Sequence, residues 1–245
     1  MNAPRLRSPL QRPTLAGVRR ALRHCASARD AAFLQRYFRT GPGEYGAGDR
    51  FLGVRMPALR HLARAAQGLP LGEVTRLLGS GWHEERLLAL LLLVDRYRCA
   101  DGATRERLYR LYLRQRRRVN NWDLVDLSAP GIVGAHLLDR DPGPLLELAR
   151  SPLLWERRIA LLATLPRIRQ GHHALTLRIT RQLLHDPHDL IHKAAGWMLR
   201  EVGKRDPAAL ERFLGRHAAV MPRTMLRYAI ERLPPRARAR HLARA

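Results

Sequence analysis

The chain contains few cysteines, lysines and acidic residues. Its 245 residues include two cysteines, Cys25 and Cys99, which lie far apart in sequence and form no metal-type cluster, so we expect structural thiols in a reducing compartment. Lysine occurs only at Lys193 and Lys204, whereas Lys and Arg together number 45 against 21 Asp and Glu, for a formal net charge of +24. Either a coding bias toward arginine or selection for arginine chemistry would explain the choice of Arg over Lys, but coding bias alone does not explain the excess of positive charge. The excess predicts a polyanionic partner, either nucleic acid or anionic lipid.

Long apolar segments are also missing from the sequence. The longest apolar run, residues 87–94, is too short to span a bilayer. The Arg-rich start, residues 1–23, is broken by prolines and lacks the apolar centre of a secretion signal. We therefore expect a cytoplasmic, nucleoid-associated protein that does not contact a membrane.

Strand patterns hardly occur, because β-branched and aromatic residues never alternate for long, while Leu and Ala recur at three- and four-residue steps. The pattern predicts an all-α fold, with breaks at Pro and Gly pairs. The expected helices cover residues 14–26, 28–39, 57–67, 71–79, 83–98, 103–117, 121–138, 143–149, 153–167, 171–185, 188–203, 207–217 and 221–232.

The starts of several helices form a weak repeat. Aligned on residues 84–87, 122–124, 155–158, 191–193 and 222–224, they recur at intervals of about 31–38 residues, close to the period of a helical-hairpin solenoid. In such a stack each hairpin buries its apolar side against its neighbours, and the second helices line a concave wall. A compact helical bundle is the alternative architecture.

The segment 120–126 combines an aromatic and a carboxylate. Trp122 and Asp126, at i and i+4, share one helix face and offer a stacking or cation-π surface beside a negative group. Arg158 falls in line with the apolar positions Leu154 and Leu161, and a guanidinium placed there needs a paired anion. Asp126, on the preceding wall helix, is the natural partner. A structural ion pair without chemistry is the alternative interpretation of this pairing.

Trp197 is unusual among the four tryptophans. It shares a helix face with Lys193 and Arg200, whereas the apolar stripe of the same helix runs through neighbouring positions. A tryptophan on the cationic side of a helix suggests ligand contact, although packing is the commoner role.

Other constellations carry weaker signals. His83 and Glu84 resemble the start of a zinc-protease helix, but the second histidine is replaced by Leu87. His185, His188 and His192 are separated by a proline that breaks the helix between the first two. We therefore expect no metal site and no small-molecule cofactor.

Several segments together resemble the AlkD-like DNA alkylation-repair glycosylases. The matching segments are residues 36–39, 51–54, 121–126, 155–158 and 195–201. That family is built from HEAT-like helical repeats that wrap DNA along a basic concave face. The resemblance thus implies an all-α, HEAT-like helical-repeat solenoid, an α–α superhelix with a basic concave groove. We expect a single repeat domain over residues 14–235, a basic N-terminal arm over 1–13 and a basic C-terminal tail over 236–245.

The resemblance also assigns roles to individual residues. The family's catalytic aspartate falls on Asp126, its neighbouring aromatic on Trp122, its essential arginine on Arg158 and its second tryptophan on Trp197. Tyr37 matches an aromatic near the lesion cleft. The insertion at residues 40–49 distinguishes this chain from the shortest members of the family and leaves the substrate range open.

The expected function is that of a monomeric, monofunctional DNA glycosylase acting on duplex DNA that contains cationic N3- or N7-alkylated purines. Asp126 would stabilise the developing positive charge on the sugar, and nearby arginines should keep it ionised. The alternatives are a non-catalytic module that holds branched or distorted DNA and a protein-binding solenoid. Phosphate contacts are expected from Arg157, Lys193, Arg200, Arg223 and Arg227.

Overall fold

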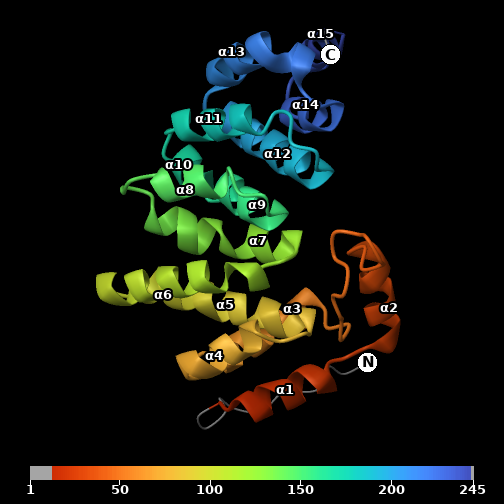
Figure 1. The fold of residues 1–245 in the computed structure, drawn as a ribbon, viewed down its shortest axis with the longest axis vertical. Helices are drawn as coiled ribbons and strands as arrows, with labels where there is room; N and C mark the ends of the chain where they lie inside the picture. The colour runs from red at the N-terminus through yellow and green to blue at the C-terminus, as the bar shows by residue number, and fades with distance from the viewer. Residues whose placement is uncertain (1–12, 244–245) are drawn as a thin grey trace. The chain divides into compact units, whose positions relative to one another are not determined.

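The fold is all-α, as the sequence predicts. The computed structural model describes residues 13–243, which contain helices, one isolated β-bridge between Arg50 and Trp82, and no strand. The predicted N-terminal arm, apart from Pro13, lies outside the described residues. The chain divides into two compact units at the boundary between Cys99 and Ala100. Figure 1 shows the helices along the chain.

The N-terminal unit is organised around its last helix. It contains α1 (Leu15–His24), α2 (Ala28–Tyr37), α3 (Met56–Ala65), α4 (Leu71–Leu78) and α5 (His83–Cys99). Helix α5 is buried on almost every side along its first three turns and packs on α1, α3 and α4. The apolar run at residues 87–94 therefore forms the core of this unit. No helix in the described part of the chain is long and apolar enough to cross a bilayer.

The first turn of α5 anchors the segment that leads from α2 to α3. Glu84 accepts hydrogen bonds from the backbone N–H groups of Leu52, Gly53 and Val54 at 2.8, 2.8 and 3.1 Å. Gly53 has a φ of +82°, and a Cβ there would lie 2.1 Å from the Ser27 carbonyl oxygen, so only glycine fits. The sequence at residues 83–85 resembles the start of a zinc-protease helix, but its Glu84 holds the backbone of residues 52–54.

The C-terminal unit is a succession of packed helices. It contains α6 (Gly102–Gln115), η1 (Arg116–Arg118), α7 (Trp122–Ser128), the π-helical turn η2 (Pro130–Gly134), α8 (Gly143–Leu148), α9 (Leu154–Leu162), α10 (Leu165–Arg169), α11 (Ala174–Gln182), α12 (Asp189–Arg205), α13 (Pro207–His217), η3 (Ala218–Val220), α14 (Arg223–Ile230) and α15 (Pro235–Leu242). Four of the predicted repeat starts, at residues 122–124, 155–158, 191–193 and 222–224, fall at the beginnings of α7, α9, α12 and α14, and the fifth, at 84–87, falls at the beginning of α5 in the N-terminal unit. Helices α7, α9, α12 and α14 each pack on the next one in that order, which confirms a helical-repeat arrangement.

Two expected helices are interrupted. The one expected over residues 121–138 changes to a π-helical turn at Pro130, because proline lacks the N–H that would continue the α-helix. In this turn Gly134 lies so close to the next repeat that a Cβ would meet the Ala163 carbonyl oxygen at 2.4 Å. The helix expected over 153–167 divides into α9 and α10 just before Pro166.

The residues expected to form a basic C-terminal tail form α15 as far as Leu242. His241 is buried, and its Nε2 lies 3.1 Å from a carboxylate oxygen of Glu211 on α13. Arg240 donates to the same oxygen at 3.0 Å. Residues 235–242 are therefore attached to the C-terminal unit through a shared carboxylate.

Candidate functional site

Asp126 and Arg158 form a two-point ion pair in the C-terminal unit. The Nε and Nη2 atoms of Arg158 each donate to a different oxygen of Asp126, both at 2.8 Å. Its Nη1 donates to the Leu190 carbonyl oxygen at 2.5 Å. One guanidinium on α9 therefore joins α7 to the first turn of α12. The prediction that Arg158 pairs with Asp126 is confirmed.

The two partners differ in exposure. The Arg158 side chain is 6% exposed, whereas 18% of the Asp126 side chain remains accessible. A carboxylate has about four lone-pair positions, and Arg158 uses two of them. The carboxylate therefore keeps the capacity to accept hydrogen bonds on its accessible side.

The pKa of Asp126 reflects opposing influences. Burial raises the pKa of this carboxyl, the hydrogen bonds and charge of Arg158 lower it, and the charge of Asp123 raises it again. The net direction is upward. We expected neighbouring arginines to dominate this balance, but the desolvation of a largely buried carboxyl outweighs their effect.

Helix α7 presents Asp126 one turn after Trp122. Asn121 caps the helix, with its side-chain oxygen accepting the Trp122 N–H at 2.8 Å. Leu124 and Val125 face the core, while Trp122 and Asp126 both lie at the partly exposed boundary. The predicted sharing of one helix face is therefore consistent with the observed burial.

Trp197 lies outside the buried stripe of α12, as predicted. The stripe contains Ile191, Ala195 and Met198, whereas Trp197 is half-buried and donates from Nε1 to Glu201 at 3.2 Å. Next to it, a Cβ on Gly196 would meet the Met225 carbonyl oxygen at 2.5 Å. Trp197 thus lies beside the close approach of α12 and α14.

Arg157 is occupied within the protein and does not fit the predicted phosphate contact. Its Nε donates to Asp186 at 2.6 Å and its Nη2 to the same carboxylate at 3.3 Å. Its Nη1 donates to the carbonyl oxygens of Ser151 and Pro152. These bonds use most of its donors and the side chain is 12% exposed, so Arg157 has less capacity for a phosphate contact than the other four predicted residues.

The other four predicted phosphate contacts are more accessible, to different degrees. Lys193 pairs with Asp189 at 2.6 Å, and Arg200 pairs with Glu231. Arg223 and Arg227 are exposed on α14, and Arg223 donates to the Leu242 carbonyl oxygen at 2.8 Å. Arg227 forms no ion pair with any residue between 13 and 243, so it is the freest of these cations.

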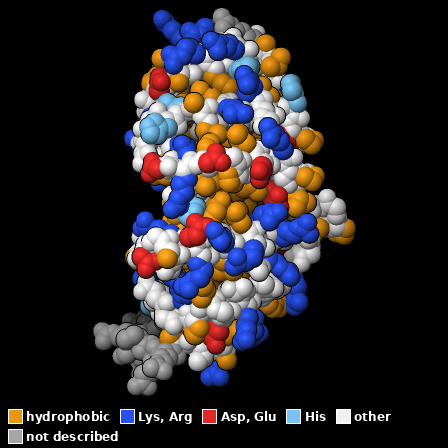
Figure 2. Space-filling view, turned by 60° about the vertical axis from the view of Figure 1, so that its left-hand side comes forward, with side chains coloured by type: hydrophobic (Ala, Val, Ile, Leu, Met, Phe, Trp, Pro, Cys, Tyr) orange, Lys and Arg blue, Asp and Glu red, His pale blue; other side chains and the backbone are white. Residues whose placement is uncertain are grey.

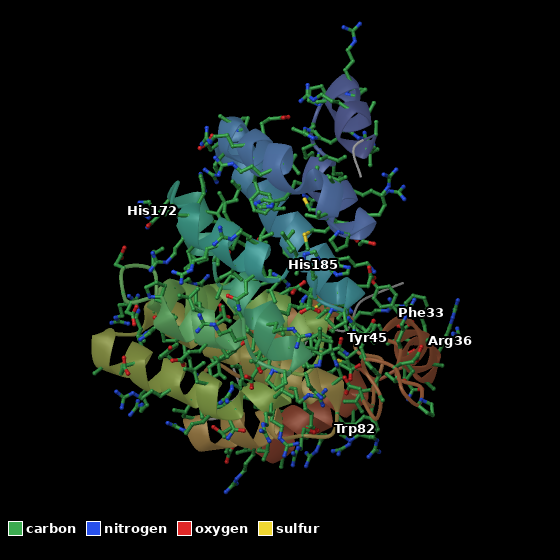
Figure 3. All side chains as sticks on the ribbon, turned by 45° about the horizontal axis from the view of Figure 1, so that its top comes forward. Phe33, Arg36, Tyr45, Trp82, His172 and His185 are labelled. Atoms are coloured by element: carbon green, nitrogen blue, oxygen red, sulfur yellow. The ribbon has the colours of Figure 1, made fainter. Side chains whose placement is uncertain are left out.

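Tyr37 belongs to the N-terminal unit, at the end of α2. It is 55% exposed and stacks on Phe33, with ring centroids 5.9 Å apart. Arg55 lies over the other aromatic of this pair, 5.5 Å from the Phe33 ring centre. Phe33 and Arg36 are labelled on α2 in Figure 3. Phe33 is not among the residues predicted from the sequence, although its i,i+4 spacing from Tyr37 was a usable signal.

Comparisons with known proteins agree on one family and one fold. A family model described as DNA alkylation repair enzyme matches residues 18–233. The fold is similar to the solved structure of a predicted DNA alkylation repair enzyme from Enterococcus faecalis, with a TM-score of 0.66 and 17% sequence identity. That similarity covers 86% of this chain and 97% of the other. No curated protein matches the sequence. At this identity the structural similarity establishes the fold, which is an all-α helical-repeat fold.

Proposed function

We propose that this chain, which belongs to the DNA alkylation repair enzyme family, is a DNA glycosylase that releases cationic N3- or N7-alkylated purines from duplex DNA. The observation that carries the proposal is the Asp126–Arg158 pair. A buried arginine fixes a carboxylate of which 18% remains accessible, one helical turn from a half-buried tryptophan. Such a fixed negative group suits a reaction that develops positive charge.

The proposed reaction needs a stabilised sugar cation. An alkylated purine already carries a positive charge, so it leaves as a neutral base when it takes the electron pair of the N-glycosidic bond. The deoxyribose then carries oxocarbenium-like charge, which Asp126 stabilises electrostatically. Water adds to the anomeric carbon and gives up a proton, either to Asp126 or to solvent, leaving an abasic site. No covalent enzyme intermediate is required, so the enzyme would be monofunctional.

The remaining predicted residues would bind and orient the DNA. Trp122 and Trp197 offer ring faces that attract a cationic base. Lys193, Arg200, Arg223 and Arg227 would contact phosphates, with Arg227 the most available. The HEAT-like character of the repeats, a basic concave groove, a role of Tyr37 near the lesion and a monomeric state belong to the same proposal.

Release of free base from methylated duplex DNA tests the proposal. The wild-type protein should release alkylpurine, and Asp126→Asn should bind the duplex but lose most of the release. Asp123→Asn is the matched control, because Asp123 lies on the same helix and its side chain accepts the Leu124 N–H. The proposal predicts that this control keeps most of its activity.

A second candidate function is non-catalytic binding of branched or distorted DNA. The observation that favours it is that Arg158 engages both oxygens of Asp126, as in a purely structural ion pair. This candidate predicts salt-sensitive DNA binding with no base release from any alkylated duplex.

A further inference from the structure

A groove of about 340 Å³ lies between α11 and α13 in the C-terminal unit. Both helices pack on α12. The residues that line this α11–α13 groove recur at helical spacing on each wall. They are Ala174, Leu177, Arg178 and Arg181 from α11, and Ala209, Arg212, Phe213, Arg216 and His217 from α13. None of the residues proposed for base release lines the groove.

The groove has an apolar floor and a cationic rim. Ala209 and Phe213 are buried, and Leu177 is half-buried, whereas all four arginines are exposed. Figure 2 brings forward the side of the molecule that bears α11 and α13 in Figure 1, and it shows basic and histidine side chains beside hydrophobic surface there. His172 and His185, labelled in Figure 3, flank α11 and do not line the groove.

The rim arginines have little counter-charge. Arg178, Arg181 and Arg216 form no ion pair with any residue in the described range 13–243. Arg212 has Asp206 at 3.8 Å, but that carboxylate also accepts the Ala209 N–H at 2.8 Å as the cap of α13. Glu211, a further acid on α13, bonds to α15 instead. Among the four guanidinium groups, only that of Arg212 therefore has a carboxylate within 4.0 Å in residues 13–243.

The cationic charges from the two walls act on the same imidazole. His217 is half-buried against Phe213, with ring centroids 4.6 Å apart. Burial lowers the pKa of His217, and the charges of Arg181 on α11 and Arg216 on α13 lower it further. The positive potential of both helices thus converges at this end of the groove.

We propose that the α11–α13 groove binds closely spaced phosphate groups, presented either by a nucleic-acid backbone or by a free polyphosphate. The planar fork of each guanidinium matches phosphate oxygens in a two-point hydrogen bond. The two arginines of each wall lie about one helical turn apart, roughly 5–6 Å along the helix axis. Such a row suits several linked phosphates better than one isolated anion. This site is separate from the proposed glycosylase chemistry.

Nuclear magnetic resonance of His217 in the full chain tests the binding directly. The imidazole C–H signal is identified by its loss in His217→Gln and is then followed while tripolyphosphate or an unmodified DNA duplex is added. We expect a saturable shift and a rise in the pKa of His217, because a bound polyanion offsets the charges of Arg181 and Arg216. No saturable change with either probe would overturn the proposal.

The two probes distinguish the sources of phosphate. If the groove takes a nucleic-acid backbone, the duplex shifts the His217 signal and tripolyphosphate competes with it. If it takes a free polyphosphate, tripolyphosphate alone produces the shift.

Two variants with equal charge loss separate a site from general attraction. One changes the four groove arginines, Arg178, Arg181, Arg212 and Arg216, to Gln. The other changes four exposed arginines of the same unit outside the groove, Arg107, Arg114, Arg150 and Arg205, to Gln. We expect the groove variant to bind tripolyphosphate about tenfold or more weakly and the control to change little. If both variants bind tripolyphosphate equally weakly, the loss of affinity reflects net charge alone, and the proposed site is refuted.

Base release by the groove variant provides a separate readout. The proposal predicts that release from a methylated duplex at saturating DNA stays close to wild type, because Asp126 and Arg158 lie on other helices. A failure of the glycosylase proposal would therefore leave the groove titration fully interpretable.

Discussion

Arg158 holds both oxygens of Asp126 from a more buried position than Asp126 itself. Its third hydrogen bond, to the Leu190 carbonyl oxygen, extends the connection from α7 and α9 to α12. Asp126 on α7, the acid of the proposed reaction, is therefore held by an arginine of α9 that is itself attached to α12. Loss of either partner should affect stability as well as chemistry.

Replacing Arg158 by Met should destabilise the fold. The change leaves Asp126 largely buried without its counter-ion and leaves the Leu190 carbonyl without its donor, which together should cost about 2–4 kcal/mol of unfolding free energy. Urea unfolding followed by circular dichroism measures the change. Arg114→Met, at an exposed position of α6, is the matched control and should stay within about 0.5 kcal/mol of wild type. Equal stability of the two variants would contradict the structural role of Arg158.

Gly196→Ala should loosen the contact between α12 and α14. The new methyl group would lie 2.5 Å from both the Met225 carbonyl oxygen and the Tyr228 Cβ, so the helices must separate. Overpacking of this kind costs about 1–3 kcal/mol, more than the helix propensity that alanine gains. Gly215→Ala on α13 meets nothing within 4 Å and should be neutral or stabilising. Thermal unfolding of the two variants tests this, and a stable Gly196→Ala protein would argue against the close packing.

Asp49 should make stability depend on pH in the acid range. Burial raises the pKa of Asp49, but hydrogen bonds and charges from His83 and Arg86 outweigh it, so the pKa lies below its ordinary value of 3.8. A carboxyl whose pKa is lower in the folded state contributes stability above the unfolded pKa and loses it as the pH falls through the folded pKa. Wild type should therefore exceed Asp49→Asn in unfolding free energy by the largest amount at pH 6, and this difference should shrink below about pH 4. If this difference instead grows as the pH falls, the pKa of Asp49 is not lowered by folding, and the prediction is contradicted.

DNA binding should depend steeply on salt. If about six to ten phosphates are neutralised, the log–log slope of the binding constant should have a magnitude of about 5–9. Arg227→Gln should lower that magnitude by about 1, because this exposed arginine has no ion pair among the described residues. Arg157→Gln should instead leave the slope unchanged and reduce stability, since its guanidinium holds Asp186. Gel shifts at several salt concentrations measure both, and an unchanged slope for Arg227→Gln would remove it from the interface.

The sequence predicts the repeat and the central ion pair because both follow from local spacing. Apolar steps along each helix place the starts of α7, α9, α12 and α14, and a charged residue in line with Leu154 requires a buried partner. The engagement of Arg157 was not predictable in this way. Its partner Asp186 lies between α11 and α12, outside the helix repeat from which the partner of Arg158 was predicted, so local spacing gives no sign of this pair.

The missed features depend on contacts between repeats. The π-helical turn has a local cause in Pro130, but the close approach of Gly134 to the Ala163 carbonyl oxygen is a contact with the next repeat that the segment alone does not reveal. Helix α15 carries few apolar side chains and appears as a tail in sequence, but its buried His241 pairs with Glu211 on α13.

The most direct measurement is single-turnover release of alkylpurine from a methylated duplex by wild type, Asp126→Asn and Asp123→Asn, with each protein in excess over DNA. We predict release by wild type and by Asp123→Asn, and retained duplex binding with release reduced about 100-fold or more for Asp126→Asn. Equal rates of release for wild type and Asp126→Asn would contradict the role assigned to this carboxylate.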